Sequence, residues 1–283
     1  MQIEVNTLAQ VRHVTVFNAV QSFQRIALSG KSPQTKKWYS YRLDLMSRSL
    51  GETRPLADVL EVDLIKYREK LEAKNISLDT LHGYIRAARR LFQWLYKKGM
   101  ISADITAEFY LPKLPRRSKK GISDAHAAQI LKAAKAHSPR DYALISFLES
   151  TGARRGGVAS LKIEALNIKS PEPLCRRARV IEKGNKERTV ILSDETITAL
   201  KSWLNVRVSK SDFVFVSADG SPLDVNSISE IIDRYKKRLK ICAPCSPHQW
   251  RHRWFRRMIS AGMPLAQAAQ LGPIGRKLGL RGQ

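Results

Sequence analysis

The pattern of apolar and polar positions divides the chain into a helical first segment, a basic connection and a mixed second segment. In the first segment, two stretches repeat apolar residues at steps of three and four, the period of one helix face. One stripe, near residues 14–27, consists of Val16, Phe17, Val20, Phe23 and Ile26. The clearer stripe, within "SLDTLHGYIRAARRLFQWLYKKG", consists of Leu81, Tyr84, Ile85, Ala88, Leu91, Phe92 and Leu95. Both stripes are predicted to face a core.

The second of these helices carries cations on its other faces. Ser77 or Asp79 is the expected N-cap, and Gly99 stands where the helix should end. Arg86, Arg89 and Arg90 lie off the apolar stripe. They form either a solvated face or a surface that binds nucleic-acid phosphates, and the second interpretation gains from the charge of the whole chain.

A basic, proline-containing stretch, "LPKLPRRSKKGIS", separates the two segments. Its composition predicts a linker at residues 113–122, between a first domain at 1–112 and a second at 123–283. The linker is either a solvated tether or a tether that crosses the backbone of a duplex. The candidate phosphate contacts in it are Arg116, Arg117, Lys119 and Lys120.

The second segment mixes helical and strand patterns. Helical periodicity covers residues 124–137 and continues through "RDYALISFLESTGARRGG"; it returns at 194–206 and 227–240. Between them, "ARVIEKGNKERTVILS" has β-branched runs on both sides of a Gly-Asn turn, which predicts a hairpin over residues 179–192. The predicted fold class is therefore mainly α with a small β-hairpin or sheet (α+β).

The charge narrows the class of partner. The chain of 283 residues has 50 Lys and Arg against 25 Asp and Glu, a net charge of +25, and most of the excess follows residue 112. Such a charge favours a polyanionic partner, with double-stranded DNA or RNA first. A membrane surface is the rival, but neither a signal peptide nor an apolar run of about 18 residues occurs. Three cysteines are too few for a disulfide framework, so a cytoplasmic location is expected.

The densest chemistry lies in "SPHQWRHRWFRRM". With Pro247 tolerated in the first turn, a helix places His248, Arg251, His252 and Phe255 on one face. Arginine offers a planar donor fork and histidine a proton carrier near neutral pH. His248 and Arg251 are therefore either a catalytic pair or part of a basic surface helix.

Two upstream residues strengthen the catalytic alternative. Arg154 follows a Thr-Gly turn, and Lys183 stands at the end of a predicted strand. Together with His248 and Arg251 they are groups that phosphoryl transfer uses without a metal ion: cations for the charge on phosphorus oxygens and a proton donor for the leaving oxygen. Lys186, just past the turn, is a further candidate DNA contact.

A metal site is the competing interpretation of the same stretch. Cys242, Cys245, His248 and His252 have the spacing C-x2-C-x2-H-x3-H, and all four are ligand types for zinc. Two residues between the second Cys and the first His leave little chain to surround an ion, so no metal or other cofactor is expected. A redox role for the cysteine pair lacks a thioredoxin-like context. Trp250 and Trp254 are expected in the core rather than stacked on bases.

The order and spacing of these motifs resemble the tyrosine recombinase, or phage integrase, family over nearly the whole chain. "TGARRGGVASL" is similar to the family box T-G-x-R-x-x-E-x-x-x-L, "VIEKGNKERTVIL" looks like its β-hairpin, and "SPHQWRHRW" matches its S-P-H-x-x-R-H box. The resemblance implies a helical core-binding domain followed by a catalytic domain. It makes Arg154, Lys183, His248 and Arg251 the catalytic residues.

The resemblance also implies a reaction. A tyrosine hydroxyl attacks a DNA phosphodiester and forms a 3′-phosphotyrosyl link, which a 5′-hydroxyl then reverses, with no metal or ATP. By this resemblance Arg154 and Arg251 stabilise the pentacoordinate phosphate, Lys183 protonates the leaving 5′-oxygen and His248 assists proton transfer at the nucleophile. The family also implies paired protomers on DNA.

The chain departs from the family pattern at two places. Pro273 occupies the His or Trp position of the family's L-G-H motif, and no tyrosine follows Tyr235, which is expected to be structural. Gly157 occupies the acidic position of the first box. Three explanations stay open for the missing tyrosine: a truncated or frame-shifted sequence, a binding-only relative, and a nucleophile supplied by another subunit or residue.

The sequence therefore supports three hypotheses. The first is a site-specific recombinase or integrase whose two domains clamp duplex DNA. The second is a catalytically inactive relative that occupies or regulates recombination sites. The third is a general RNA- or DNA-binding regulator, which would bind without sequence specificity.

Overall fold

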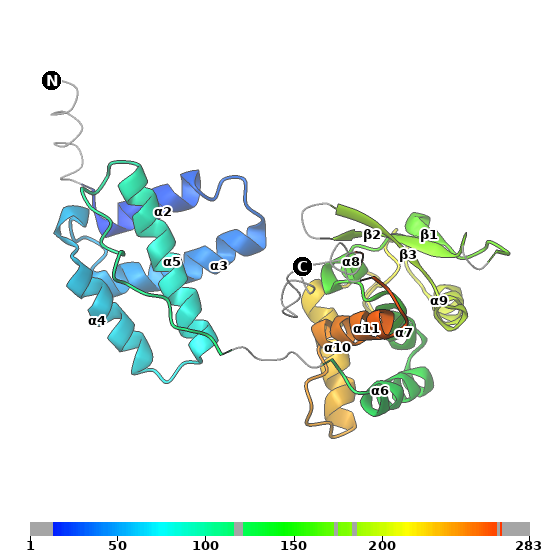
Figure 1. Ribbon diagram of the computed structural model, residues 1–283. Coiled ribbons are helices and arrows are strands. Elements are labelled where there is room, and N and C mark those ends of the chain that lie inside the picture. The colour runs from blue at the N-terminus through cyan, green and yellow to red at the C-terminus, as the bar shows by residue number, and fades with distance from the viewer. Residues whose placement is uncertain (1–13, 116–120, 173–174, 183–185, 265–266, 268–283) are drawn as a thin grey trace. The chain divides into compact units, whose positions relative to one another are not determined.

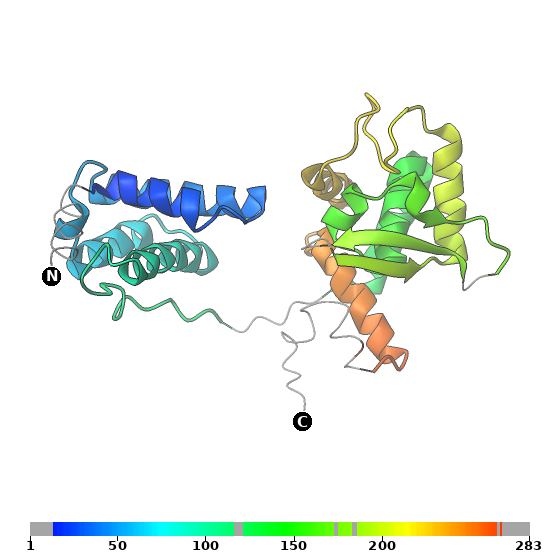
Figure 2. The ribbon, with the colours of Figure 1, turned by 90° about the horizontal axis from the view of Figure 1, so that it is seen from above.

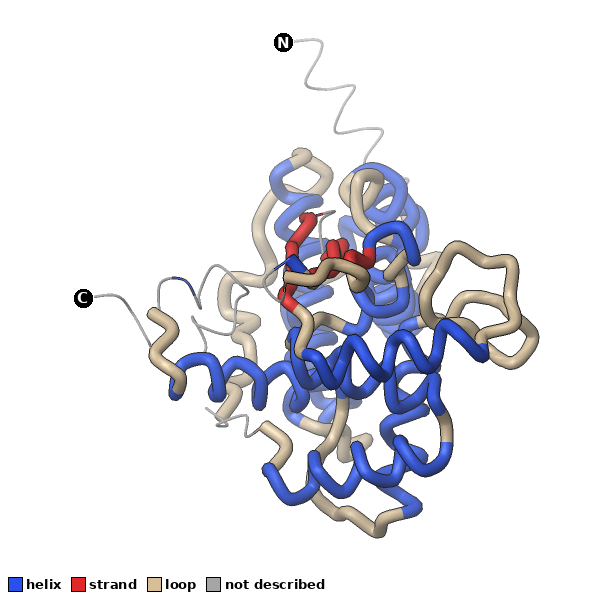
Figure 3. Tube along the Cα trace, turned by 90° about the vertical axis from the view of Figure 1, so that its right-hand side faces the viewer, coloured by secondary structure: helices blue, strands red, loops and turns tan. Residues whose placement is uncertain are grey.

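The computed structural model describes residues 14–115, 121–172, 175–182, 186–264 and 267. The chain forms two compact units, residues 1–116 and 117–283, and the division lies within the predicted basic linker. The predicted fold class, mainly α with a small β-sheet, is confirmed. Figure 3 shows strands in one small region, while helices and loops make up the rest of the described chain.

The described part of the first unit consists of helices joined by loops, with one isolated β-bridge between Thr15 and Pro55. Its helices are α2 (Val16–Ile26), α3 (Pro33–Leu50), α4 (Glu61–Glu72) and α5 (Leu78–Lys97), with a short 3-10 turn, η1 (Leu56–Asp58). Helices α2, α3, α4 and α5 pack around one core (Figure 1). Side-chain oxygens of Thr15, Ser32 and Ser77 accept hydrogen bonds from the first turns of α2, α3 and α5, so each of these helices begins at a polar cap.

The apolar stripe of α5 behaves as predicted, whereas that of α2 does so only in part. All seven predicted stripe residues of α5 are buried, and Ser77 is its N-cap. In α2, Val16, Val20 and Phe23 are buried, but Phe17 is 44% and Ile26 52% exposed. The prediction was wrong for these two residues because the buried face of this short helix is narrower than the run of apolar residues in the sequence.

The second unit joins helices to a three-stranded antiparallel sheet. Before the sheet come α6 (Asp124–His137), α7 (Pro139–Thr151), α8 (Arg155–Ala159) and the 3-10 turn η2 (Ile163–Ala165). After it come α9 (Asp194–Val206), α10 (Val225–Arg238) and α11 (Pro247–Ser260). Helix α7 contacts α6, α9 and α11 and is buried along most of its length, so it is the centre of this unit.

The sheet has the order β1-β2-β3, with β1 (Leu166–Asn167), β2 (Arg177–Glu182) and β3 (Lys186–Ile191). Strands β2 and β3 pair antiparallel up to Glu182 opposite Lys186, which confirms the predicted hairpin. Figure 2 shows the strands lying across the helices of this unit. Ala178 and Val180 are buried on the inward side of β2, and Glu182 follows them with the same alternation. The sheet therefore brings the end of β2 toward α8.

Candidate functional site

The basic stretch forms a helix, as predicted. Helix α11 begins after its N-cap residue Ser246, with Pro247 in the first turn, where a missing N–H costs no helical bond. Trp250, 0% exposed, and Trp254, 8% exposed, anchor the helix in the core, as expected. His248 and Arg251, on the same helix, line a pocket of about 360 Å³.

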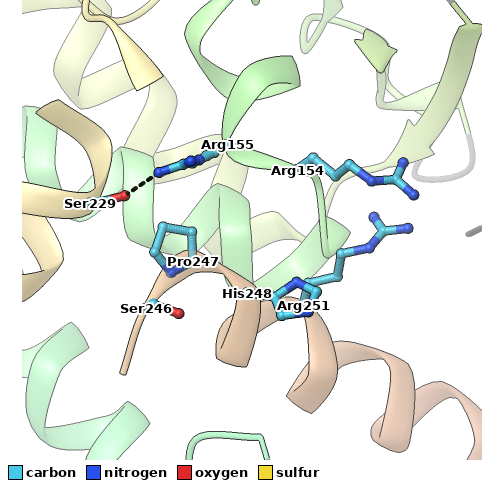
Figure 4. Close-up of a pocket in the computed structure, with 7 residues that line it drawn as sticks. All are labelled: Arg154, Arg155, Ser229, Ser246, Pro247, His248 and Arg251. Atoms are coloured by element: carbon cyan, nitrogen blue, oxygen red, sulfur yellow. Dashed lines mark hydrogen bonds between the residues drawn. The ribbon is translucent and has the colours of Figure 1, made fainter. Parts of the chain in front are cut away.

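The pocket collects residues from three helices that are distant in sequence. It is lined by Arg154, Arg155, Ser229, Ser246, Pro247, His248 and Arg251 (Figure 4). In this view the guanidinium groups of Arg154 and Arg251 lie next to each other, while Arg155 turns away and donates to the Ser229 hydroxyl at 3.2 Å. The structure thus brings together three of the four predicted catalytic residues: Arg154, His248 and Arg251.

Arg154 owes its position to the turn between α7 and α8. Gly152 ends α7 in the left-handed conformation, with φ of +56°, which glycine adopts without steric cost. Arg154 is then the residue that precedes the first turn of α8. The carbonyl oxygen of Gly152 accepts a hydrogen bond from Nη1 of Arg251 at 2.5 Å. This turn therefore positions both arginines.

A carboxylate that the sequence analysis did not single out lies at the centre of the cluster. Glu182, whose side chain is 7% exposed, forms ion pairs with Arg154, Arg188 and Arg251. Its Oε1 lies 3.2 Å from Nη1 of Arg251 and 3.6 Å from Nη2 of Arg188. One buried carboxylate is thus shared by three guanidinium groups.

Arg188, on β3, is the other residue that sequence reasoning missed. Its Nη2 donates to the carbonyl oxygen of Thr151 at 3.0 Å, and its guanidinium carbon lies 5.6 Å from the centre of the Trp254 ring. The available signal was its place on the hairpin, six residues after Glu182, but strand alternation alone does not reveal which arginine of a basic hairpin turns inward. Arg188 holds β3 against the end of α7.

Burial lowers the pKa values of the three arginines in the cluster. Desolvation lowers the pKa of Arg251 to about 9, and the neighbouring charges of Arg154 and Arg188 add to this. Desolvation likewise lowers the pKa of Arg188 to about 10 and also lowers that of Arg154. Three cations with one carboxylate carry two net positive charges in a partly dehydrated place. Such an arrangement favours an anion that enters the pocket.

His248 stands beside Arg251 and contacts a second histidine. Nε2 of His248 lies 3.1 Å from Nε2 of His252, so the N–H of one ring donates a hydrogen bond to the nitrogen of the other. His248 is exposed and His252 is buried, with 7% of its surface accessible. The exposed ring is in a position to exchange a proton with a bound ligand.

The remaining predicted site residues are more dispersed. Lys183 lies outside the described residues, as do Arg116, Arg117, Lys119 and Lys120. Lys186 is exposed at the start of β3. In the first unit, Arg90 is exposed, whereas Arg89 donates to the carbonyl oxygens of Thr106 and Phe109, and these hydrogen bonds give it a structural role.

Arg86, which is exposed, belongs to an aromatic and cationic group on α3 and α5 whose other members are partly or fully buried. Its guanidinium carbon lies 4.7 Å from the centre of the Trp38 ring, and that of Arg42 lies 4.2 Å from the same ring. Arg42 also lies 5.3 Å from the ring of Tyr84. Stacking on the ring holds these guanidinium planes in place without using all of their donors.

The four residues of the competing zinc interpretation do not form a metal site in the structure. Within the part of the chain that the structure describes, no three His, Cys, Asp or Glu side chains come close enough to hold a metal ion. Cys242 is exposed, whereas Cys245 is buried, and burial raises the pKa of its thiol. The two cysteines therefore do not converge with the histidine pair.

Tyr235, the last tyrosine in the sequence, is a core residue, as expected. It is 1% exposed, and its hydroxyl donates to Oδ2 of Asp141 at 3.0 Å. Burial first, and the Asp141 carboxylate second, raise the pKa of this phenol.

Among the described helices, none is both long and apolar enough to cross a membrane.

Comparisons with known proteins agree with the motifs. Residues 121–272 match the "Phage integrase family" model, and residues 20–99 match "Phage integrase, N-terminal SAM-like domain". The tyrosine recombinase XerC of Shewanella amazonensis is 26% identical over 245 residues, which cover 85% of this chain and 81% of XerC. XerD of Vibrio cholerae is 29% identical over 239 residues, covering 80% of this chain and 78% of XerD.

Solved structures show the same fold at low sequence identity. A lambda integrase dimer bound to a COC′ core site superposes with a TM-score of 0.76 and 15% identity, over 94% of this chain and 76% of that one. The fold of both units is therefore shared with an integrase. Because the first family match alone spans more than half of the sequence, and the motif boxes fall within it, the chain belongs to the phage integrase family of tyrosine recombinases.

Proposed function

We propose that this protein binds duplex DNA at a specific site and acts in site-specific DNA recombination or integration. The observation that carries the proposal is the pocket at which Arg154, Arg251 and His248 meet. A phosphodiester is the anion that fits a pair of planar donor forks beside an imidazole. XerC, XerD and lambda integrase, which this chain resembles, are named as recombinases or integrases.

Three residues of the pocket have a role in this proposal. Arg154 and Arg251 bind the non-bridging oxygens of the scissile phosphate and stabilise the charge that develops on them. His248 exchanges a proton with the attacking group. Lys183, by its place in the family pattern, protonates the leaving 5′-oxygen. No cofactor takes part in these proposed steps.

A tyrosine hydroxyl is the nucleophile that the family resemblance implies. The second unit contains two tyrosines, Tyr142 and Tyr235. Both are buried, and their hydroxyl groups donate to Glu195 at 2.7 Å and to Asp141 at 3.0 Å. If strand cleavage occurs, its nucleophile is neither of these. The same observation favours a second candidate function, a relative that binds recombination sites without cutting them.

The rest of the DNA contact is proposed from exposed cations. Backbone phosphates would be contacted by Arg86 and Arg90 on α5, by Lys186 on β3 and by the basic linker. These contacts would fix the register of the protein on the duplex. The lambda integrase structure is a dimer on its core site, and we propose that this chain also associates with a second copy on DNA. The relatives XerC and XerD come from bacteria, whose DNA lies in the cytoplasm, and we propose the same location for this chain.

Incubation of the full chain with a nicked suicide duplex tests the proposal. The duplex carries a site selected by the protein from a random pool, and a denaturing gel detects a covalent adduct. A retarded band on a native gel that Arg251→Ala weakens supports site binding. Arg256→Ala, which removes an exposed cation from the same helix, is the matched control.

The outcomes separate the two candidate functions. An adduct that Arg251→Ala abolishes supports recombination, and peptide mapping then identifies the nucleophile. A specific retarded band with no adduct supports the binding-only relative. A chain that selects no sequence, or that loses as much affinity with Arg256→Ala as with Arg251→Ala, contradicts both.

A further inference from the structure

The acidic position of the first family box is occupied by Gly157, so α8 (Arg155–Ala159) supplies no carboxylate to the two site arginines. Gly157 is buried in α8. A Cβ atom placed on it would lie 3.1 Å from the carbonyl oxygen of Ile181 and 3.9 Å from Cγ of Glu182. A side chain at position 157 would therefore extend toward the end of β2, where the Glu182 side chain already lies.

Glu182 reaches the same arginines from the strand. Its Oε2 pairs with Nη1 of Arg154, and its Oε1 lies 3.2 Å from Nη1 of Arg251. Oε1 also accepts from the backbone N–H of Arg154 at 3.4 Å. The carboxylate thus binds the side chain and the backbone of one arginine and the side chain of the other.

These contacts restrain the arginines for a ligand. A guanidinium group has five N–H donors in one plane, so a carboxylate at one edge fixes the plane while other donors face the pocket. Without this restraint, ordering two long side chains would cost entropy when phosphate binds. Since three guanidinium groups share Glu182, the cluster keeps its positive charge for the ligand.

We infer that Glu182, on β2, is the positioning residue for Arg154 and Arg251, and that it supplies the carboxylate which Gly157 in α8 lacks. The inference rests on the proposed function, because positioning has meaning only if the arginines bind a DNA phosphate. In this chain the carboxylate beside the site arginines lies on the strand and not on the helix. An acidic residue at position 157 should therefore replace Glu182.

The test measures the contact with one phosphate. Wild-type protein first selects a duplex from a random pool, and each phosphate near its centre is then replaced singly by a neutral methylphosphonate. The ratio of Kd for the substituted and the natural duplex reports the contact at that phosphate. In wild type the most sensitive position should show a ratio of about ten, the size of a charge-assisted hydrogen bond.

Variants of both positions distinguish positioning from simple structural support. Glu182→Ala and the isosteric Glu182→Gln should lower the ratio toward one, and Arg251→Ala should do the same. In the Glu182→Ala background, Gly157→Glu should restore the ratio, and Gly157→Gln, of the same size, should not. Circular dichroism melting checks that each variant folds; if Glu182→Ala does not, Glu182→Gln decides.

The experiment distinguishes failure of the proposed function from failure of the inference about Glu182. If wild type selects no sequence, or shows a ratio of one at every phosphate, the proposed function fails and the inference fails with it. If wild type shows the ratio but folded Glu182→Gln retains it, the inference alone is overturned. Equal restoration by Gly157→Gln and Gly157→Glu also overturns it, because space filling rather than charge would then be the cause.

Discussion

The indole ring of Trp254 lies directly against Gly152, 102 positions earlier in the chain, so closely that a Cβ atom on the glycine would stand 2.5 Å from Cε3 of the ring. Nε1 of Trp254 donates to the carbonyl oxygen of Ser150 at 2.8 Å. The ring therefore covers the end of α7. Arg251, three residues before Trp254 on α11, donates a hydrogen bond to the Gly152 carbonyl oxygen. A packing contact and a site contact depend on the same glycine.

Gly152→Ala should destabilise the second unit by about 3 kcal/mol, since it adds left-handed strain and a clash with the ring. Urea unfolding followed by tryptophan fluorescence measures this. Gly156→Ala is the matched control: Gly156 is exposed in α8, and its Cβ would meet no atom within 4 Å. The control should be neutral or slightly stabilising. Equal losses for both variants would contradict the assignment.

Tyr235→Phe should lower stability without affecting chemistry on DNA. The change removes the hydroxyl that donates to Asp141, a carboxylate 1% exposed that also pairs with Arg140 and Arg234. Loss of a hydrogen bond to a buried charged group costs about 2 kcal/mol. Thermal melting measures the loss, and the suicide-duplex assay should give the wild-type result. An adduct that disappears in a stably folded Tyr235→Phe variant would make Tyr235 the nucleophile.

Arg89 and Arg90 are adjacent in α5 but should respond differently to alanine. Arg89 donates to the carbonyl oxygens of Thr106 at 2.9 Å and Phe109 at 2.6 Å, so its loss should cost the first unit about 2 kcal/mol. Arg90 is exposed, and its loss should leave stability unchanged and reduce the slope of log affinity against log salt by about 1. Fluorescence anisotropy and unfolding of both variants check the pair. A salt slope that only Arg89→Ala changes would reverse the two roles.

Asp63 should make the stability of α4 depend on pH. Its Oδ2 accepts from Nη2 of Arg54 and from the backbone N–H of Leu60, each at 2.9 Å, and these hydrogen bonds lower its pKa below the usual 3.8. The ionised carboxylate therefore stabilises the folded state above about pH 4, and this contribution is lost as the pH falls through the lowered pKa. Asp63→Asn removes the charge that pairs with Arg54 and should cost about 0.5 kcal/mol at pH 7, the size of a partly exposed ion pair.

Hydrogen exchange of α4 amides in the full chain measures the effect of Asp63. The difference between wild type and Asp63→Asn should shrink as the pH is lowered from 5 to 3. Asp58→Asn, at a neighbouring carboxylate of η1, is the control. A difference that stays constant over this range would contradict the role of the ionised group.

The local sequence was sufficient where a pattern repeats or a motif has a fixed order. The stripe of α5, the β2–β3 hairpin and helix α11 follow from periodicity and turn residues, because these depend on neighbours a few positions away. The same holds for His248 and Arg251, which share a helix face. The family boxes likewise located Arg154 before any contact was known.

What the sequence by itself determined is thus the class of fold, the family and three members of the site. Only the tertiary structure decided how the charges are balanced. Glu182 and Arg188 form an ion pair on the β2–β3 hairpin, and Arg89 donates a hydrogen bond to a backbone carbonyl oxygen. No feature of the nearby sequence distinguishes these residues from exposed residues of the same type. The physical reason is that burial and ion pairing depend on chain segments brought together by folding, and Glu182 meets Arg251 across 69 positions of sequence.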